Sequence, residues 1–191
     1  AYAEELSPSG HNLALVAQYM YQHHREAFDA VLEKMARRVP GVSKVEASET
    51  VDGRIVLRFH DGSFKDPFIA RYVSDGTLKM FAYLLLLSEP AHRPLLCIEE
   101  PENYLYPDLL TELAEEFREY AERGGQVFIS THSPDFVNAV GIEELFWLQK
   151  TQGYSSIHRA KNHELVQEMF RAGDKLGWLW KEDFFTGVDP E

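Results

Sequence analysis

The sequence predicts an α/β fold with a parallel sheet, on three observations. Residues 95–98 and 127–130 are short apolar runs, typical of parallel strands that are buried on both faces. An amphipathic helical pattern at residues 107–123 separates them and ends in a Gly-Gly pair. An apolar helix at residues 77–87 precedes the first run, and a Ser-Pro pair after the second is typical of a helix start. This alternation of helices and strands favours parallel pairing.

The flanking regions predict different elements. Residues 11–39 follow a helical period, as one long helix or two shorter ones, and a Pro-Gly pair ends it. Residues 42–71 alternate apolar and polar side chains between Asp-Gly turns, which predicts a small antiparallel β-meander. Residues 145–159 predict a hairpin that turns at Gly153, with a short helix near residues 163–171. Five aromatic residues are expected to pack a C-terminal layer or a partner's face: Trp147, Trp178, Trp180, Phe184 and Phe185.

The length of 191 residues suits a single domain. We divide it into a helix and β-meander (1–72), a central core (73–140) and a C-terminal hairpin with helices (141–191). With 31 acidic and 19 basic residues the net charge is −12, so nucleic acid is repelled at long range. DNA or an effector protein would therefore bind elsewhere than on this acidic segment.

Cysteine content and hydropathy point to the cytoplasm. Cys97 is the single cysteine, so no disulfide can form within the chain, as is usual in a reducing compartment. The most apolar stretch, residues 81–87, is far shorter than the about 20 apolar residues that span a bilayer. The expectation is a cytoplasmic protein that does not enter a membrane.

Two adjacent carboxylates follow the first predicted strand, in the run Glu99-Glu100-Pro101-Glu102-Asn103. Ligands of open α/β sheets bind at the carboxyl ends of the strands. Paired carboxylates in such a place suit phosphoryl transfer, where one holds Mg²⁺ and the other orients or deprotonates the attacking water. We assign Glu99 to the metal and Glu100 to the water. The plainer alternative is a solvated acidic turn after a core strand.

A second candidate segment, Ser74-Asp75-Gly76-Thr77, comes just before the apolar helix. A helix N-terminus presents free N–H groups and the positive end of the helix dipole, so Ser74 and Gly76 could meet a phosphate. The carboxylate of Asp75 would repel that phosphate unless it points away. Taken alone, the segment is better explained as an ordinary N-cap made by Ser74 or Asp75.

The third candidate is His132, which follows the second predicted strand. It would lie at the same sheet edge as the two carboxylates, where a neutral imidazole can hydrogen-bond a γ-phosphate or the attacking water. A histidine in such a turn is more often a polar loop residue. The order and spacing of all three segments together make the stronger case.

These segments resemble the C-terminal half of ABC-superfamily ATPase domains. In particular they resemble the AAA-type ATPases of that superfamily with Glu-Glu-Pro-Glu in Walker B, which are related to SMC/RecF-like and OLD-family ATPases. Residues 73–77 match the signature motif, residues 95–100 Walker B, residues 103–106 the D-loop and His132 the H-loop. Residues 173–190 also look like the end of such proteins. The fold implied is the C-terminal half of a P-loop NTPase.

The resemblance implies an Mg²⁺-dependent ATPase that works as a nucleotide-sandwich homodimer. Its implied catalytic residues are Glu100 and His132, and Glu99 would hold Mg²⁺ through water. The resemblance implies that Ser74 and Gly76 act across the dimer, on ATP held by the other subunit's P-loop. The residues expected to bind the nucleotide are Ser74, Asp75, Gly76, Thr77 and Asn103. Three departures from the family pattern stand out: Asp75 for the transporters' Gly, Glu99 for the commoner Asp, and Tyr106 where relatives often have His.

The chain has no Gly-Lys dipeptide, so it holds no P-loop to cradle the phosphates. In the family the P-loop lobe lies upstream, and we expect this chain alone to be inactive without it. Three alternatives stay open. One is a metal-dependent nuclease using Glu99, Glu100 and Glu102. Another is an ATPase subunit of a nuclease or phage-defence system, and the third is a catalytically silent interaction module. The acidic residues at 112–122 are expected to form a solvated helix face.

Overall fold

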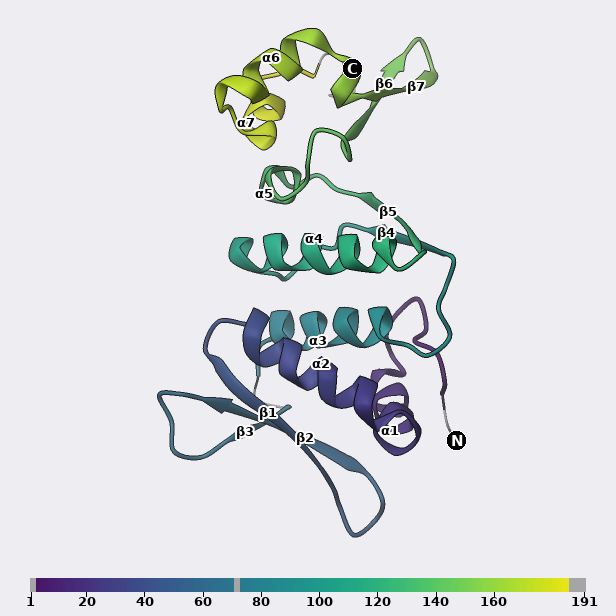
Figure 1. The fold of residues 1–191 in the computed structure, drawn as a ribbon, viewed down its shortest axis with the longest axis vertical. Helices are drawn as coiled ribbons and strands as arrows, with labels where there is room; N and C mark the ends of the chain where they lie inside the picture. Colours follow the sequence, from purple (N-terminus) through teal and green to yellow (C-terminus); the bar gives the residue numbers. More distant parts are fainter. Residues whose placement is uncertain (1–2, 71–72, 186–191) are drawn as a thin grey trace. The chain divides into compact units, whose positions relative to one another are not determined.

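The computed structural model describes residues 3–70 and 73–185, which form two compact units. The first unit is Ala1–Cys97 with Asn103–Phe128, and the second is Ile98–Glu102 with Ile129–Glu191. The elements are labelled in Figure 1. They are α1 (Leu13–His23), α2 (Arg25–Arg38), β1 (Val42–Glu49), β2 (Ile55–Asp61), β3 (Phe68–Ile69), α3 (Asp75–Leu87), β4 (Leu95–Glu99), α4 (Pro107–Glu122), β5 (Gln126–Ser130), α5 (Pro134–Asn138), β6 (Phe146–Thr151), β7 (Tyr154–Arg159), η2 (Ala160–Asn162), α6 (Glu164–Ala172) and α7 (Leu176–Lys181). The mixed α/β class is the one predicted; the single domain of residues 1–191 stays a prediction.

The first unit begins with two helices rather than one, because the chain leaves the helical conformation at His24 (φ −135°). The β-meander follows as predicted, with β1, β2 and β3 in antiparallel order. Val45 pairs with Phe59 in the register of β1 and β2, and both side chains are buried. Helix α2 packs on β1. The predicted end of the meander, residue 71, lies outside the described residues.

Helices α3 and α4 complete the core of this unit. Helix α3 begins at Asp75, ahead of the predicted start at Thr77, because Ser74 caps it. It packs on both α2 and α4. The buried side chains of α3 include Phe81 and Leu84, and those of α4 include Leu113 and Phe117.

The acidic face of α4 is not simply solvated, contrary to the prediction. Lys34 and Arg38 of α2 both form ion pairs with Glu116, which is only 2% exposed. Lys34 also contacts Glu119 at 3.0 Å. The remaining ion pairs join Arg38 to Glu112, Glu115 and Glu119. The two helices are 74 to 85 residues apart along the chain at these contacts, so no local pattern foreshadows them.

Strands β4 and β5 form a two-stranded sheet. The N–H of Gln126 donates to the carbonyl of Pro94 (2.9 Å), and the N–H of Glu100 donates to that of Ser130 (2.8 Å), so the pairing is parallel as predicted. The expectation that both faces are covered is wrong for this chain. Leu95 is 48% exposed and Phe128 is 58% exposed, whereas Leu96 is buried. Exposure alternates along each strand because one face has no layer packed on it.

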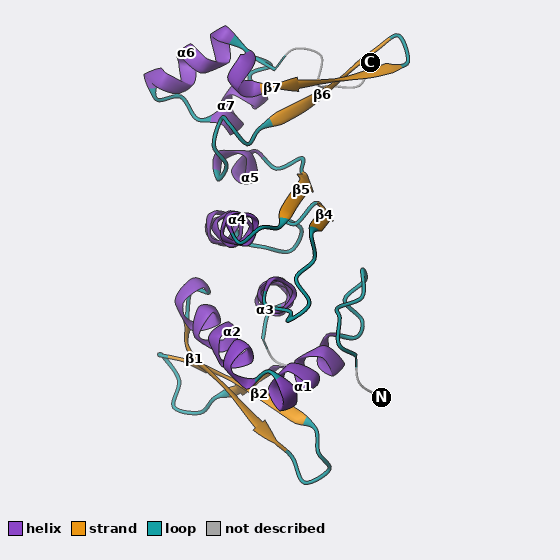
Figure 2. Cartoon of the chain, turned by 45° about the vertical axis from the view of Figure 1, so that its right-hand side comes forward, coloured by secondary structure: helices purple, strands orange, loops and turns teal. Residues whose placement is uncertain are grey.

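The second unit contains the predicted hairpin, drawn in orange in Figure 2. Strands β6 and β7 pair antiparallel around Gln152 and Gly153, both with positive φ, as a tight hairpin turn requires. Trp147, Trp180 and Phe184 pack, as expected, against a cluster of buried side chains: Val137, Ala160, Val166, Leu176, Leu179 and Phe185. Trp178 is 44% exposed. Residues 187–190, part of the family-like tail, lie outside the described residues.

Helix α7 is not foreseen from the sequence, because it is short and carries Gly177 in its interior. A Cβ at Gly177 would lie 2.0 Å from the carbonyl oxygen of Pro134, so glycine permits α7 to approach α5. No helix within the described ranges is both long and apolar enough to cross a membrane.

Candidate functional site

The carboxyl end of β4 carries the two predicted carboxylates. Glu99 is the last residue of the strand and is exposed. Glu100 follows it with φ +43°, a left-handed conformation that costs a residue with a side chain about 1–3 kcal/mol. Its N–H donates to the carbonyl of Ser130, so this backbone turn is fixed against the end of β5. Strain of this kind concentrates at functional sites.

Glu102 joins the end of β4 to the segment that follows β5. Its Oε1 accepts hydrogen bonds from the Thr131 hydroxyl (2.6 Å) and from the backbone N–H of His132 (3.1 Å). The Thr131 hydroxyl in turn accepts from the N–H of Ser133 (3.0 Å). The other oxygen, Oε2, is buried and has no hydrogen-bond partner among the described residues. These contacts bring Glu100 and His132 to one edge of the sheet.

His132 lies between β5 and α5 and is an exposed residue. Its backbone is held by Glu102, and the chain directly after it is fixed by the Ser133 cap. The Ser133 hydroxyl accepts from the N–H of Phe136 (3.3 Å), as the Ser-Pro pair predicts. The backbone of His132 is therefore held in place while the residue itself is exposed to solvent.

The signature-like segment belongs to the first unit. The Ser74 hydroxyl accepts from the N–H of Thr77 (3.2 Å) and lies 2.9 Å from the Thr77 hydroxyl. The N-cap interpretation is thus confirmed, because the Ser74 hydroxyl accepts from a backbone N–H in the first turn of α3. Ser74 and Asp75 are exposed, whereas Gly76 is buried.

Gly76 is buried because the D-loop-like segment packs against it. A Cβ at Gly76 would lie 2.6 Å from the carbonyl oxygen of Tyr104, a residue that itself has φ +68°. Lys79, one turn along α3, donates to the carbonyl of Asn103 (2.7 Å). Its ammonium group lies 5.7 Å from the ring centroid of Tyr83 and 5.9 Å from that of Tyr104. The structure therefore brings Asn103 beside the signature-like helix, through two residues that sequence reasoning missed, Lys79 and Tyr104.

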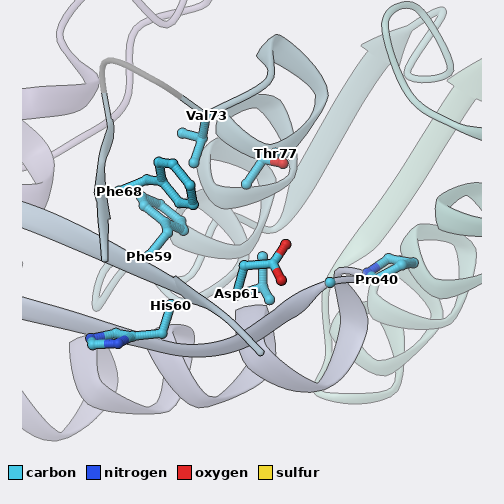
Figure 3. Close-up of a pocket in the computed structure, with 9 residues that line it drawn as sticks. Pro40, Phe59, His60, Asp61, Phe68, Val73 and Thr77 are labelled. Carbon is cyan, nitrogen blue, oxygen red and sulfur yellow. The ribbon is translucent and has the colours of Figure 1, made fainter. Parts of the chain in front are cut away.

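A cavity of about 230 Å³ lies beside this helix, within the first unit. Figure 3 shows Phe59, Phe68 and Asp61 pointing toward it and the imidazole of His60 pointing away. Its nine lining residues include no Lys or Arg that could neutralise phosphate charges. Thr77 is the one predicted nucleotide-binding residue in its wall, so the cavity does not replace the sheet edge as the candidate site.

The carboxylates at the sheet edge fit an Mg²⁺–nucleotide better than a bare metal cluster. In the part of the chain that the structure describes, no three His, Cys, Asp or Glu groups are placed to hold a metal ion. The trio that a nuclease would need, Glu99, Glu100 and Glu102, is therefore not arranged as a metal site, and Glu102 is turned toward Thr131 instead. Mg²⁺ bound with a nucleotide needs one or two carboxylates, with waters and phosphates completing its shell. The Glu99 side chain is exposed, so its carboxylate is open to such an ion.

Comparison with solved structures finds chains of similar fold. The solved structure described as "Structural biochemistry of ATP-driven dimerization and DNA stimulated activation of SMC ATPases" has a TM-score of 0.57 at 16% identity, over 81% of this chain and 97% of that one. An Smc head domain from Pyrococcus furiosus bound to the C-terminal domain of ScpA has a TM-score of 0.58 at 13% identity. That match spans 81% of this chain and 40% of the Smc chain.

A third structure, an SmcHead bound to the C-winged helix domain of ScpA, has a TM-score of 0.54 at 12% identity, over 76% of this chain and 48% of that one. The chain thus spans less than half of the length of two of these three structures. At such identities the likeness shows the fold alone. No curated protein matches the chain.

A sequence family decides membership more directly. The family described as "AAA domain, putative AbiEii toxin, Type IV TA system" matches residues 8–138, which include the carboxylates at the end of β4, the signature-like segment and His132. The match covers more than half of the 191 residues. The chain belongs to this family of AAA-type ATPase domains, and its fold is that of SMC ATPase heads.

Proposed function

We propose that the chain is the C-terminal part of an ABC-type ATPase, which binds and hydrolyses Mg²⁺–ATP once a P-loop lobe completes it. The observation that carries this proposal is the sheet edge at the ends of β4 and β5. There Glu100 is held in a left-handed turn against Ser130, and Glu102 holds the backbone of His132. Carboxylates and an imidazole at the carboxyl ends of parallel strands are the groups that phosphoryl transfer uses.

Each residue of this edge has a proposed role. Mg²⁺, when bound with the nucleotide, supplies positive charge that stabilises the phosphates. Glu99 holds it through a water molecule. Glu100 accepts a hydrogen bond from the attacking water and orients it, and the exposed imidazole of His132 bonds the γ-phosphate end. The plainer interpretation, a solvated acidic turn, does not account for the strained backbone of Glu100.

The signature-like segment is proposed to act in trans. Ser74, Asp75, Gly76 and Thr77 open α3, whose N–H groups and dipole favour an anion, and Asn103 lies beside them on the D-loop-like segment. In a head-to-tail homodimer these residues would meet the nucleotide that the other subunit holds. Dimerisation driven by ATP is also what the description of one similar SMC structure names.

The missing P-loop lobe is the first proposed partner. The uncovered face of β4 and β5 exposes Leu95, Cys97 and Phe128, and an apolar sheet face of this kind requires a further layer. Since the chain has no Gly-Lys, it is proposed to have no ATP turnover alone. DNA or an effector would engage other parts of the protein, and the cytoplasmic location expected from the sequence is kept as part of this proposal.

Substitution of Glu100 tests the proposal in a protein that includes the P-loop lobe. Glu100→Gln keeps the shape of the side chain but removes its basicity, and loss of one catalytic base costs about 10²–10⁴-fold in rate. The variant should bind Mg²⁺–ATP, fail to hydrolyse it and accumulate as a dimer. Light scattering with and without Mg²⁺–ATP measures the dimer, and a phosphate-release assay measures the rate.

A matched control is Glu122→Gln, which changes an exposed carboxylate at the end of α4 and should turn over like the wild type. If Glu100→Gln binds ATP and its mass does not change, the trans-acting signature mechanism is wrong. A nuclease or a silent interaction module would form no ATP-trapped dimer, so either alternative would be favoured by that result.

A further inference from the structure

Glu102 is a third carboxylate at the candidate site, half-buried like Glu100, whereas Glu99 is exposed. It lies two residues after Glu100, at the turn that follows β4, and its Oε2 is shielded from solvent. A carboxyl group turned into the protein is poorly placed to serve as an exposed metal ligand or as a base for bulk water. Its bonded oxygen, Oε1, instead receives two donors from the segment after β5.

We propose that Glu102 is a positioning residue, which fixes the backbone of His132 relative to Glu100 so that the imidazole meets the reacting phosphate in register. This inference rests on the proposed ATPase function. It assigns Glu102 no contact with the nucleotide. The ends of β4 and β5 are then joined twice, by the Glu102 side chain and by the backbone hydrogen bond from the Glu100 N–H to the Ser130 carbonyl.

The geometry supports positioning because the contact is made to the main chain of His132 and leaves its ring free. The Glu102 carboxylate accepts from the His132 N–H at 3.1 Å and from the Thr131 hydroxyl at 2.6 Å. The Thr131 hydroxyl in turn accepts from the N–H of Ser133, the residue that caps α5, so the backbone of Ser133 is held as well. Glu102 Oε1 and the Thr131 hydroxyl thus hold three consecutive residues in place, and hydrogen bonds to a carboxylate are among the stronger ones.

The experiment uses four variants with two readouts. Glu102→Ala removes the acceptor, Glu102→Gln retains an acceptor oxygen of the same reach, and Thr131→Val removes the hydroxyl donor at constant shape. Glu168→Ala is the matched control, because Glu168 is an exposed residue on α6 of the same unit. The first readout is the hydrogen exchange rate of the His132 amide, measured by NMR on the full chain.

Loss of a hydrogen bond to a charged group should speed His132 exchange by about tenfold or more in Glu102→Ala. In Glu102→Gln and Glu168→Ala the rate should stay within about twofold of the wild type. Thr131→Val should speed exchange at Ser133 as well. The second readout is ATP turnover of the protein that includes the P-loop lobe. A misplaced catalytic group typically costs about 10²-fold, so kcat should fall by about that factor in Glu102→Ala with KM unchanged, and Gln should restore it.

The proposal is overturned if Glu102→Ala leaves exchange at His132 unchanged in a protein with an otherwise native spectrum. It is also overturned if Glu102→Gln loses as much turnover as Glu102→Ala, since a charge would then matter rather than position. If Glu102→Ala does not fold, Thr131→Val decides through the same two readouts. A wild-type protein that binds no ATP would contradict the proposed function, and the exchange rates would still decide whether Glu102 positions His132.

Discussion

At the scale of a single residue, Gly76 is required for packing, whether or not a ligand binds near it. Its missing side chain is required because the carbonyl oxygen of Tyr104 occupies the place where a Cβ would be. The obstacle is backbone, held by Tyr104 in a left-handed conformation, so it cannot rotate aside as the end of a long side chain can. A glycine in a signature-like segment is thus needed even without a phosphate.

Gly76→Ala should therefore destabilise the first unit despite the better helix propensity of alanine. Overpacking costs about 1–3 kcal/mol, and the propensity gain of at most about 1 kcal/mol offsets only part of it. Urea unfolding followed by circular dichroism measures the change. The matched control is Gly62→Ala, whose Cβ meets nothing within 4 Å and which should be close to neutral. Equal stability of Gly76→Ala and wild type would show that the D-loop-like segment yields without cost.

At the scale of secondary-structure elements, ion pairs join α2 to α4. Glu116 is buried between Lys34 and Arg38, and breaking such a buried pair leaves a charge without compensation. The Lys34 ammonium group also holds the pKa of Glu119 below its ordinary value, through their hydrogen bond. Ion pairs thus contribute to the contact between α2 and α4, although the acidic composition of that face of α4 suggests a solvated surface.

The lowered pKa of Glu119 sets the sign of a pH dependence. A carboxyl group with a lowered folded-state pKa adds stability above its ordinary value, about 4.3, and loses that contribution as the pH falls through the lowered one. Lys34→Met should cost about 2 kcal/mol at neutral pH, because Arg38 still compensates Glu116, and the cost should shrink below about pH 4. Thermal unfolding across this pH range checks it. Lys65→Met, at an exposed residue of the same unit, should show no such trend, and a cost independent of pH would argue against the ion pairs as its cause.

At the scale of the whole molecule, the two-stranded parallel sheet is an incomplete layer. Parallel sheets in α/β proteins are covered on both faces, and Leu95 and Phe128 are exposed here on the uncovered one. The same face is where a P-loop lobe would complete the proposed ATPase. The exposed face and the absence of Gly-Lys both support the proposal that a separate P-loop lobe packs here.

Phe128→Asp should leave this chain folded, since the side chain is already 58% exposed, but should weaken its assembly with the P-loop lobe. A charge buried in an apolar interface without a partner costs several kcal/mol, so affinity should fall by at least about 100-fold. Co-purification of the two parts, or calorimetric titration, measures it. Val51→Asp, at a fully exposed position of the first unit, is the control. Undiminished assembly of Phe128→Asp would place the lobe on another surface.

Local patterns in the sequence determined most of the element order and the candidate residues. The Ser74 and Ser133 caps, the Asp-Gly turns and the apolar strands act over a few residues, so their signals can be read without knowing the fold. Contacts between distant segments could not be read in this way. Glu102 meets Thr131 across 29 residues, Lys34 meets Glu116 across 82, and Gly177 leaves room for α7 to approach Pro134. Such contacts depend on how elements pack, which only the tertiary structure decides. The exposed face of β4 and β5 could not be predicted either. An apolar strand predicts that a layer covers it, but not that this chain supplies the layer.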